Sequence, residues 1–354
     1  MAPSLRPLAE QTIVVTGASS GIGLATARHA ARAGARVLLA ARNEGALRDV
    51  VAGIREAGGT AEYVVADVAD KAGVERIAAE AIRHFGGFDT WVNNAGISIF
   101  GRLEQVTDED HRRLFDVNFW GLVWGSQVAA RHLRSRGGAI VNLGSVASDV
   151  AFPIQGMYAA SKHAIKGFTD ALRMELQEDD APISVTLIKP ASIDTPLPQN
   201  ARNYLDAEPA LPPPIYRPED VASAILYAAV HGGRDYYVGG GAKLISTLNK
   251  HAPKAIDWMG PQISRMEKGG PLRRDRAGNL HGMGRDGSER GEAASLVRPS
   301  AYTAAHTHPF AAIALLAAGA AGLAYLVAPS RRGAKRGTGP ARPRATSLPS
   351  RARP

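Results

Sequence analysis

The sequence predicts an α/β protein built on a doubly wound parallel sheet. Short apolar runs alternate with longer stretches of helical periodicity from about residue 11 to residue 238. Each run contains consecutive apolar residues rather than a strict alternation, as expected for strands that are covered on both faces. Right-handed crossovers then place helices on both sides of the sheet, and such sheets bind ligands at the carboxyl ends of their strands.

The individual elements follow from these runs and from the periodic segments between them. Strands are expected at Thr12–Thr16, Arg36–Ala40, Glu62–Ala66, Thr90–Asn93, Ala139–Asn142 and Ser184–Ile188. Helices are expected at Ile22–Ala33, Glu44–Ala57 and Lys71–His84, with a long helical pattern from Tyr158 to Leu176.

Composition is that of a globular protein with a large core. The chain has 354 residues, of which 45% are hydrophobic and 21% are charged. It contains no cysteine, which excludes disulfides, thiolate metal sites and a cysteine nucleophile. The histidines show no metal-ligand spacing, so we expect no metal.

The net charge of +9 is confined to the end of the chain. Residues 1–264 carry 26 Lys and Arg against 28 Asp and Glu, whereas residues 265–354 carry 16 against 5. The main body therefore has no general attraction for nucleic acid, and we expect no nucleic-acid partner.

A glycine-rich turn follows the first strand. Gly17, Gly21 and Gly23 stand in the stretch Thr16-Gly-Ala-Ser-Ser-Gly-Ile-Gly23 and lead into a helix. Glycine allows a ligand to approach the backbone, and the free amides at a helix start hold pyrophosphate. The residues expected to bind a dinucleotide here are Gly17, Ser19, Ser20, Gly21, Ile22 and Gly23.

The ends of the next strands suggest which dinucleotide binds. Arg42 follows the second strand, where a carboxylate would bind a ribose diol, and an arginine can instead pair with a 2′-phosphate. This favours NADP(H), with NAD(H) as the alternative, and a solvated arginine is the competing interpretation. Asp67 and Val68 are placed to meet the adenine, and Asn94, Ala95 and Gly96 follow the fourth strand.

A tyrosine and a lysine are spaced for proton transfer. Tyr158 and Lys162 lie four residues apart at the start of a helical pattern, so they share one helix face. A nearby ammonium and an oxidised nicotinamide would favour the phenolate and lower the tyrosine pKa. Tyr158 could then act as general acid or base, with Ser145 hydrogen-bonding the substrate oxygen. Taken alone the pair is weak evidence, since a packed tyrosine beside a snorkelling lysine would look the same.

Taken together and in this order, these residues resemble the short-chain dehydrogenase/reductase family over roughly residues 10–240. The resemblance implies a single Rossmann-type domain and a catalytic tetrad of Asn118, Ser145, Tyr158 and Lys162. Within it, Lys162 would bind the nicotinamide ribose and Asn118 would position a water. It also implies cofactor contacts by Pro190, Ile193 and Thr195. The family usually has Gly after that proline, whereas this chain has Ala191, which would be costly if the backbone there needs positive φ.

The resemblance also implies that two stretches, Ser145–Met157 and Thr195–Tyr216, line the substrate pocket. No Lys or Arg clusters near Ser145, which argues against an acidic substrate. Residues 196–216, rich in proline, read as a semi-rigid lid loop. We expect a hydrophobic alcohol or ketone of steroid, retinoid or lipid type, although simple packing of the loop carries comparable weight. The apolar candidates are Val146, Val150, Phe152, Ile154, Met157, Leu197, Tyr204, Leu205, Leu211 and Ile215.

The rest of the chain differs in composition. Residues 8–245 are expected to form the catalytic domain and 246–309 a partly disordered linker, because 269–300 are rich in Gly, Arg, Asp and Ser. Residues 310–328 carry no charge and are long enough for a transmembrane or interfacial helix, followed by a basic disordered tail, 329–354. An Ala-rich helix packed on the protein is the alternative. The uncharged run and the basic residues after it predict membrane association, as a helix that crosses the membrane or lies in its interface, and the catalytic domain is expected at the cytoplasmic face.

These observations together predict an NADP(H)-dependent oxidoreductase that interconverts a hydroxyl and a carbonyl group. The alternative is a catalytically idle nucleotide-binding sensor or membrane scaffold. By analogy with the family, the protein is expected to be a homo-oligomer.

Overall fold

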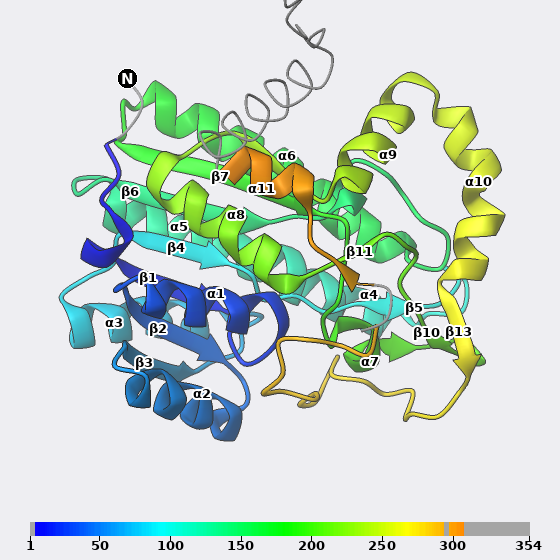
Figure 1. The fold of residues 1–354 in the computed structure, drawn as a ribbon, viewed down its shortest axis with the longest axis horizontal. Helices are drawn as coiled ribbons and strands as arrows, with labels where there is room; N and C mark the ends of the chain where they lie inside the picture. The colour runs from blue at the N-terminus through cyan, green and yellow to red at the C-terminus, as the bar shows by residue number, and fades with distance from the viewer. Residues whose placement is uncertain (1–3, 294–296, 308–354) are drawn as a thin grey trace, which may run out of the picture. The chain divides into compact units, whose positions relative to one another are not determined.

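The computed structural model describes residues 4–293 and 297–307, and its centre is a seven-stranded parallel sheet (Figure 1). In order across the sheet, the strands are β12 (Asp235–Val238), β7 (Ile183–Pro190), β6 (Gly138–Leu143), β4 (Thr90–Asn93), β1 (Thr12–Thr16), β2 (Arg36–Ala41) and β3 (Thr60–Val65).

The central strand β1 shows why the sheet is covered on both faces. All five of its residues are buried, with Ile13 and Val15 in one apolar core and Val14 in the other. Strand order reverses between β1 and β4, because the chain runs outward from β1 to β3 and then returns to β4. A crevice at the carboxyl ends of β1 and β4 is the expected ligand site of such a sheet. The predicted doubly wound α/β fold is confirmed.

Helices pack on both faces of the sheet and form an apolar core with it on each face. The first face carries α1, α2 and α8, whose apolar residues pack with Ile13 and Val15, and the second carries α3, α5 and α6. These helices are α1 (Gly21–Arg32), α2 (Glu44–Glu56), α8 (Pro218–His231), α3 (Lys71–Phe85), α5 (Gly121–Leu133) and α6 (Gly156–Glu178).

Shorter elements connect the sheet to the rim of the crevice. Two turns matter for the site: a π-helical turn, Asp116–Trp120, and a 3₁₀ turn, Val146–Ser148. The remaining elements are a 3₁₀ turn at Leu8–Glu10, β5 (Ile99–Phe100), α4 (Asp108–Phe115), β8 (Ser192–Ile193), α7 (Leu197–Asn200), β9 (Arg202–Asn203), β10 (Ala207–Pro209), β11 (Ile215–Tyr216), α9 (Gly240–His251), α10 (Pro253–Met266), β13 (Lys268–Pro271), β14 (Val297–Arg298) and α11 (Ala301–Thr307).

The segment after the sheet differs from the linker that composition suggested. The expected boundary at residue 245 falls inside α9, and β13 pairs with β10. From β13 the chain returns along the body toward α11, as the yellow-to-orange segment of Figure 1 shows. Residues 279–290, called the strap below, are hydrogen-bonded to the glycine loop and to the end of β2. Because backbone and polar side chains hold the strap, a composition poor in apolar residues does not reveal it.

The uncharged run 310–328 and the basic tail 329–354 lie outside the described residues. Within residues 4–293 and 297–307, no helix combines the length and apolar character needed to cross a membrane. Membrane association, the cytoplasmic-face location and the homo-oligomer stay predictions.

Candidate active site

The glycine loop leaves no room for side chains between β1 and α1. Gly17 has a φ of +65°, a conformation that L side chains rarely adopt. A Cβ on Gly23 would lie 2.2 Å from the carbonyl oxygen of Gly17, which is an impossible contact. The Ser20 side chain makes no capping hydrogen bond at the start of α1. The pyrophosphate of a dinucleotide fits this cradle by the helix-terminus chemistry described above, and in the structure the Gly21 amide donates to the carbonyl oxygen of Ser288 at 2.9 Å.

Asn94 ties the end of β4 to this loop. Its Nδ2 donates to the carbonyl oxygens of Thr16, at 2.9 Å, and Gly17, at 3.1 Å. In return, the Thr16 hydroxyl accepts from the backbone amides of Asn94, at 3.0 Å, and Ala95, at 3.1 Å. Asn94 thus fixes the two strand ends on either side of the crevice.

Ser145, Tyr158 and Lys162 meet where β6 ends. Ser145 caps the 3₁₀ turn, its hydroxyl accepting from the amide of Ala147 at 3.1 Å. Tyr158 and Lys162 lie on the first turns of α6, and the Lys162 Nζ is 5.7 Å from the centre of the Tyr158 ring. The same Nζ donates to the carbonyl oxygen of Leu143, at 2.9 Å. The ammonium is therefore held directly beside the phenol.

Burial dominates the ionisation of this pair. It raises the pKa of Tyr158 to about 12, although the hydrogen bond with Ser145 works in the opposite direction. Burial also lowers the pKa of Lys162 to about 8, because the ammonium loses its water. The lowered tyrosine pKa expected from the sequence is therefore not found in the protein alone. The expectation counted the neighbouring charge but not the cost of a buried phenolate.

Asn118 lies in the π-helical turn and is almost fully buried. Its Oδ1 accepts from the amide of Ile97 at 2.8 Å, and its Nδ2 donates to the carbonyl oxygen of the same residue at 3.0 Å. The Nδ2 also contacts the hydroxyl of Ser161 at 3.3 Å, next to Lys162. The side chain thus joins the loop after β4 to α6. The water-positioning role that the resemblance implies stays a prediction.

Charged groups meet at the ends of β2 and β3. Arg113 forms an ion pair with Asp67, with Nη2 2.5 Å from Oδ2. Burial raises the pKa of Asp67, but hydrogen bonds from Arg113 and from the amide of Ala69 outweigh it and hold that pKa below its ordinary value. Burial lowers the pKa of Arg42, which donates to the carbonyl oxygen of Asn279 at 2.7 Å. Arg42 is therefore bonded to the strap rather than solvated.

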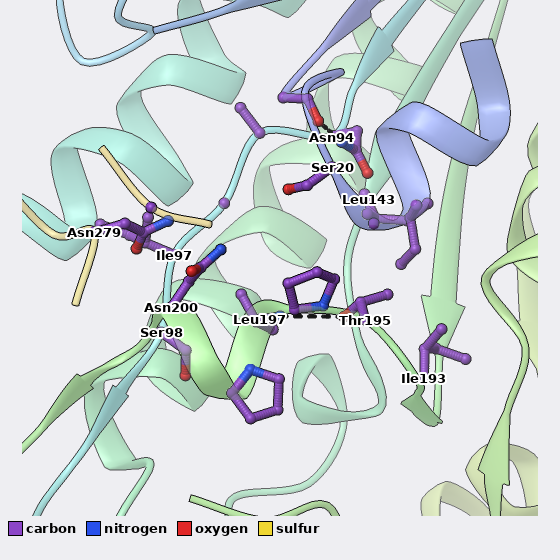
Figure 2. Close-up of a pocket in the computed structure, with 18 of the residues that line it drawn as sticks. Ser20, Asn94, Ile97, Ser98, Leu143, Ile193, Thr195, Leu197, Asn200 and Asn279 are labelled. Atoms are coloured by element: carbon purple, nitrogen blue, oxygen red, sulfur yellow. Dashed lines mark hydrogen bonds between the residues drawn. The ribbon is translucent and has the colours of Figure 1, made fainter. Parts of the chain in front are cut away.

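The segment after β7 accommodates Ala191 without strain. Ala191 is not among the residues with positive φ, and its amide donates to Val238 at 2.9 Å. The cost considered for replacing glycine there does not arise. Ile193 and Thr195 follow in the lining of the cavity, and Figure 2 shows Thr195 next to Leu197.

One cavity brings nearly all predicted site residues together. Figure 2 shows Ser20 and Asn94 at one side of it and Asn200 with Asn279 at another. Two predicted residues do not line it: Gly23, which packs against the loop, and Asn118, which lies behind it. Those that line it are Gly17, Ser19, Ser20, Gly21, Ile22, Arg42, Asp67, Val68, Asn94, Ala95, Gly96, Ser145, Tyr158, Lys162, Pro190, Ile193 and Thr195.

The substrate end contains some of the expected apolar residues. Val146, Phe152, Leu197 and Leu211 line the cavity. Four of the other candidates are buried in the protein and do not line the cavity: Val150, Ile154, Leu205 and Ile215. Met157 does not line the cavity either, and the Tyr204 hydroxyl donates to Asp110 at 2.6 Å. Packing of the loop, the competing interpretation, therefore accounts for several of them.

Sequence reasoning missed residues that enter the cavity from loops and from the extension. Gln155, Asn200 and Pro212 lie inside the two stretches expected to line the substrate pocket but were not named as candidates, and no motif or expected strand end marks the others. The missed residues include Ser98, Phe100, Gln155, Asn200, Pro212, Glu267, Asn279, Met283, Gly284 and Asp286.

Comparison with known proteins agrees with this geometry. Residues 11–205 match the family model described as short chain dehydrogenase. The chain belongs to the short-chain dehydrogenase family. Over 256 residues, 72% of each chain, this dehydrogenase is 51% identical to the uncharacterized oxidoreductase YxnA of Bacillus subtilis. It is 34% identical over 263 residues to 11-beta-hydroxysteroid dehydrogenase A of Sesamum indicum, covering 71% of this chain and 75% of the relative.

A solved structure supports the same assignment for this short-chain dehydrogenase. A short chain dehydrogenase/reductase from Burkholderia phymatum, in complex with NAD, aligns with a TM-score of 0.65 at 26% identity. The alignment covers 76% of the present chain and all of the Burkholderia chain.

The buried Lys162 predicts a specific dependence of stability on pH. Its pKa is about 8 in the folded protein against an ordinary value of 10.5, so the unfolded chain binds more protons between these pH values. The free energy of unfolding should therefore rise between pH 8 and pH 9.5, by up to about 1.4 kcal/mol per pH unit. Lys162→Met should lack this rise in urea unfolding series. A difference between wild type and variant that does not change with pH would contradict the prediction.

Proposed function

We propose that this protein interconverts a hydroxyl and a carbonyl group on a hydrophobic small molecule, with a nicotinamide dinucleotide as hydride partner. The observation that carries the proposal is the convergence of Ser145, Tyr158 and Lys162 with the glycine loop in one cavity. The sesame relative, which is named as a hydroxysteroid dehydrogenase, supports the reaction type and a hydrophobic substrate.

The chain's own residues supply the proton chemistry of this reaction. The bound nicotinamide supplies or accepts the hydride at the substrate carbon. In carbonyl reduction, Tyr158 gives its proton to the oxygen while the carbon receives the hydride, and in alcohol oxidation it takes that proton back. Ser145 holds the oxygen by a hydrogen bond. Lys162 stabilises the phenolate that reduction leaves behind, because its ammonium lies beside the ring.

We further propose that the cofactor is NADP(H) in preference to NAD(H). Arg42 stands at the end of β2, and Ser19 and Asn43 stand beside it with polar groups that can donate to an anion. No carboxylate follows β2 where a ribose diol partner would stand. These features support a 2′-phosphate at this end of the cavity.

The proposed acid predicts the effect of Tyr158→Phe. Removing only the hydroxyl should lower kcat for a proven alcohol or ketone by about 100-fold or more, with cofactor affinity retained. Steady-state kinetics and cofactor fluorescence measure the two effects. Tyr63→Phe is the matched control, because Tyr63 lies on β3 and outside the cavity lining, with its hydroxyl 3.4 Å from Glu44 of α2. Unchanged turnover in Tyr158→Phe would contradict the mechanism.

The alternative function, a catalytically idle nucleotide-binding sensor, predicts a different result for wild type. It would bind the cofactor but turn over none of a broad panel of alcohols and ketones.

The proposed cofactor preference predicts the effect of Arg42→Ala. Losing a charge-assisted contact to the 2′-phosphate should raise the KM for NADPH by about tenfold or more and leave the KM for NADH nearly unchanged. Arg36→Ala is the control, because Arg36 is exposed at the opposite end of the same strand. Equal effects of Arg42→Ala on both cofactors would count against a 2′-phosphate contact.

A further inference from the structure

Glu267 places an unpaired carboxyl in the apolar part of the cavity. It follows α10, and its backbone carbonyl accepts from the amide of Ala210 at 2.9 Å, which puts it beside the lid loop. Only 2% of the residue is exposed, and its Oε2 has no hydrogen-bond partner among the described residues. It lines the cavity together with Phe152, Leu211 and Pro212.

A buried carboxyl without a partner is costly unless something else satisfies it. Burial raises the pKa of Glu267 to about 8, so at neutral pH it is mostly a neutral acid that can both donate and accept. The three acidic residues that line the cavity are Asp67, Asp286 and Glu267, and the first two lie at the Arg42 end. Glu267 is thus the acidic residue of the cavity lining that lies apart from the charged groups around Arg42.

We propose that Glu267 hydrogen-bonds a second oxygen function of the substrate, a hydroxyl remote from the reacting carbon. This inference rests on the proposed function and narrows its substrate class to hydrophobic skeletons with two oxygen groups. A neutral hydroxyl suits the site better than an ammonium, because an ion pair here would have to be stripped of water among apolar side chains.

The test compares Glu267→Leu and Glu267→Gln with wild type on two probes. One probe is a steroid ketone with a hydroxyl at the far end of the skeleton, and the other is the same ketone without that hydroxyl. Wild type should prefer the hydroxylated probe by about tenfold in kcat/KM. Glu267→Leu should lose this preference, and Glu267→Gln should keep part of it.

Stability separates a binding role from a structural one. Glu267→Leu should melt at or above the wild-type temperature, because it removes a buried group without a partner. A lower melting temperature, an unchanged preference in Glu267→Leu, or equal handling of both probes by wild type would each overturn the inference. Tyr158→Phe distinguishes the failures: if it abolishes turnover while Glu267→Leu changes nothing, only the role of Glu267 is lost.

A second and independent observation concerns the strap. The Asp286 carboxylate accepts from the Ser19 hydroxyl at 2.7 Å and from the Asn43 amide at 2.9 Å. Arg42 is bonded to Asn279 in the same segment, and it also feels the charge of Asp286. The groups proposed to bind a 2′-phosphate are therefore already occupied by the strap.

The backbone of the strap strengthens this arrangement. The amide of Gly287 donates to the carbonyl oxygen of Ser19 at 2.8 Å, and the amide of Gly21 donates to that of Ser288 at 2.9 Å. The Asp286 carboxylate is an anion whose two oxygens accept from Ser19 and Asn43. A 2′-phosphate would make the same kind of hydrogen bonds with these two residues.

We infer that Asp286 competes with the 2′-phosphate, so that NADP(H) must break the bonds of Asp286 to Ser19 and Asn43 whereas NAD(H) need not. The inference rests on the proposed cofactor preference and makes Asp286 a specificity-determining residue of the extension.

Direct binding tests this competition without turnover. In fluorescence titrations, Asp286→Ala should bind NADPH about tenfold more tightly and NADH within twofold of wild type. Glu289→Gln is the matched control, because it removes the strap's ion pair with Arg28, at 2.7 Å, and leaves Ser19 and Asn43 untouched. It should change neither affinity by more than twofold.

Three results would overturn the inference. The first is an unchanged NADPH affinity in Asp286→Ala. The second is weaker binding of both cofactors by Asp286→Ala, which is expected if the strap holds any dinucleotide in place. The third is an equal effect of Asp286→Ala and Glu289→Gln on cofactor affinity. If Arg42→Ala leaves NADPH affinity unchanged while Asp286→Ala tightens it, the competition stands and the assignment to Arg42 falls.

Discussion

The contact between Lys162 and the end of β6 links the fold to the chemistry. Its ammonium is almost fully buried and donates to Leu143, the last residue of the strand. That bond holds the start of α6 against the carboxyl end of β6, and it thereby places Tyr158 beside Ser145. Because the ammonium loses its water there, its charge costs free energy in the protein alone. A phenolate beside it would offset that cost, which makes the pair suited to a proton that comes and goes.

The sequence was informative wherever one local rule decides the structure. Strands buried on both faces must be apolar throughout, so β1, β4 and β6 were predictable, and a loop whose Gly23 touches a carbonyl oxygen can only be glycine. The sequence did not reveal elements whose structure depends on tertiary contacts. The strand β12 is short and half-buried, and the strap has polar contacts and a single fully buried apolar residue, Leu280. The raised pKa of Tyr158 in the protein alone likewise depends on burial, which only the packed structure shows.

Each end of the cavity contains a carboxyl group, and the two groups have opposite effects on ligand binding. At the cofactor end, the Asp286 carboxylate is fully bonded, so any anion that binds there must exchange with it. At the substrate end, the Glu267 carboxyl is buried with its Oε2 unbonded to any described residue, so a ligand hydroxyl that binds this carboxyl would supply a hydrogen bond that the folded protein lacks. The first arrangement works against ligand binding and the second favours it.

Asp110 joins the lid loop to the strap. This buried carboxylate accepts from Tyr204 of the lid loop at 2.6 Å and contacts His281 of the strap at 2.8 Å. Burial raises its pKa, yet hydrogen bonds from Tyr204, His281 and Arg202 hold that pKa below its ordinary value, so the anchor stays ionised. A change at Asp110 would therefore disturb the lid loop and the strap at once. Asp286 and Glu267 each contact one end alone, and that separation allows cofactor choice and substrate choice to be measured independently.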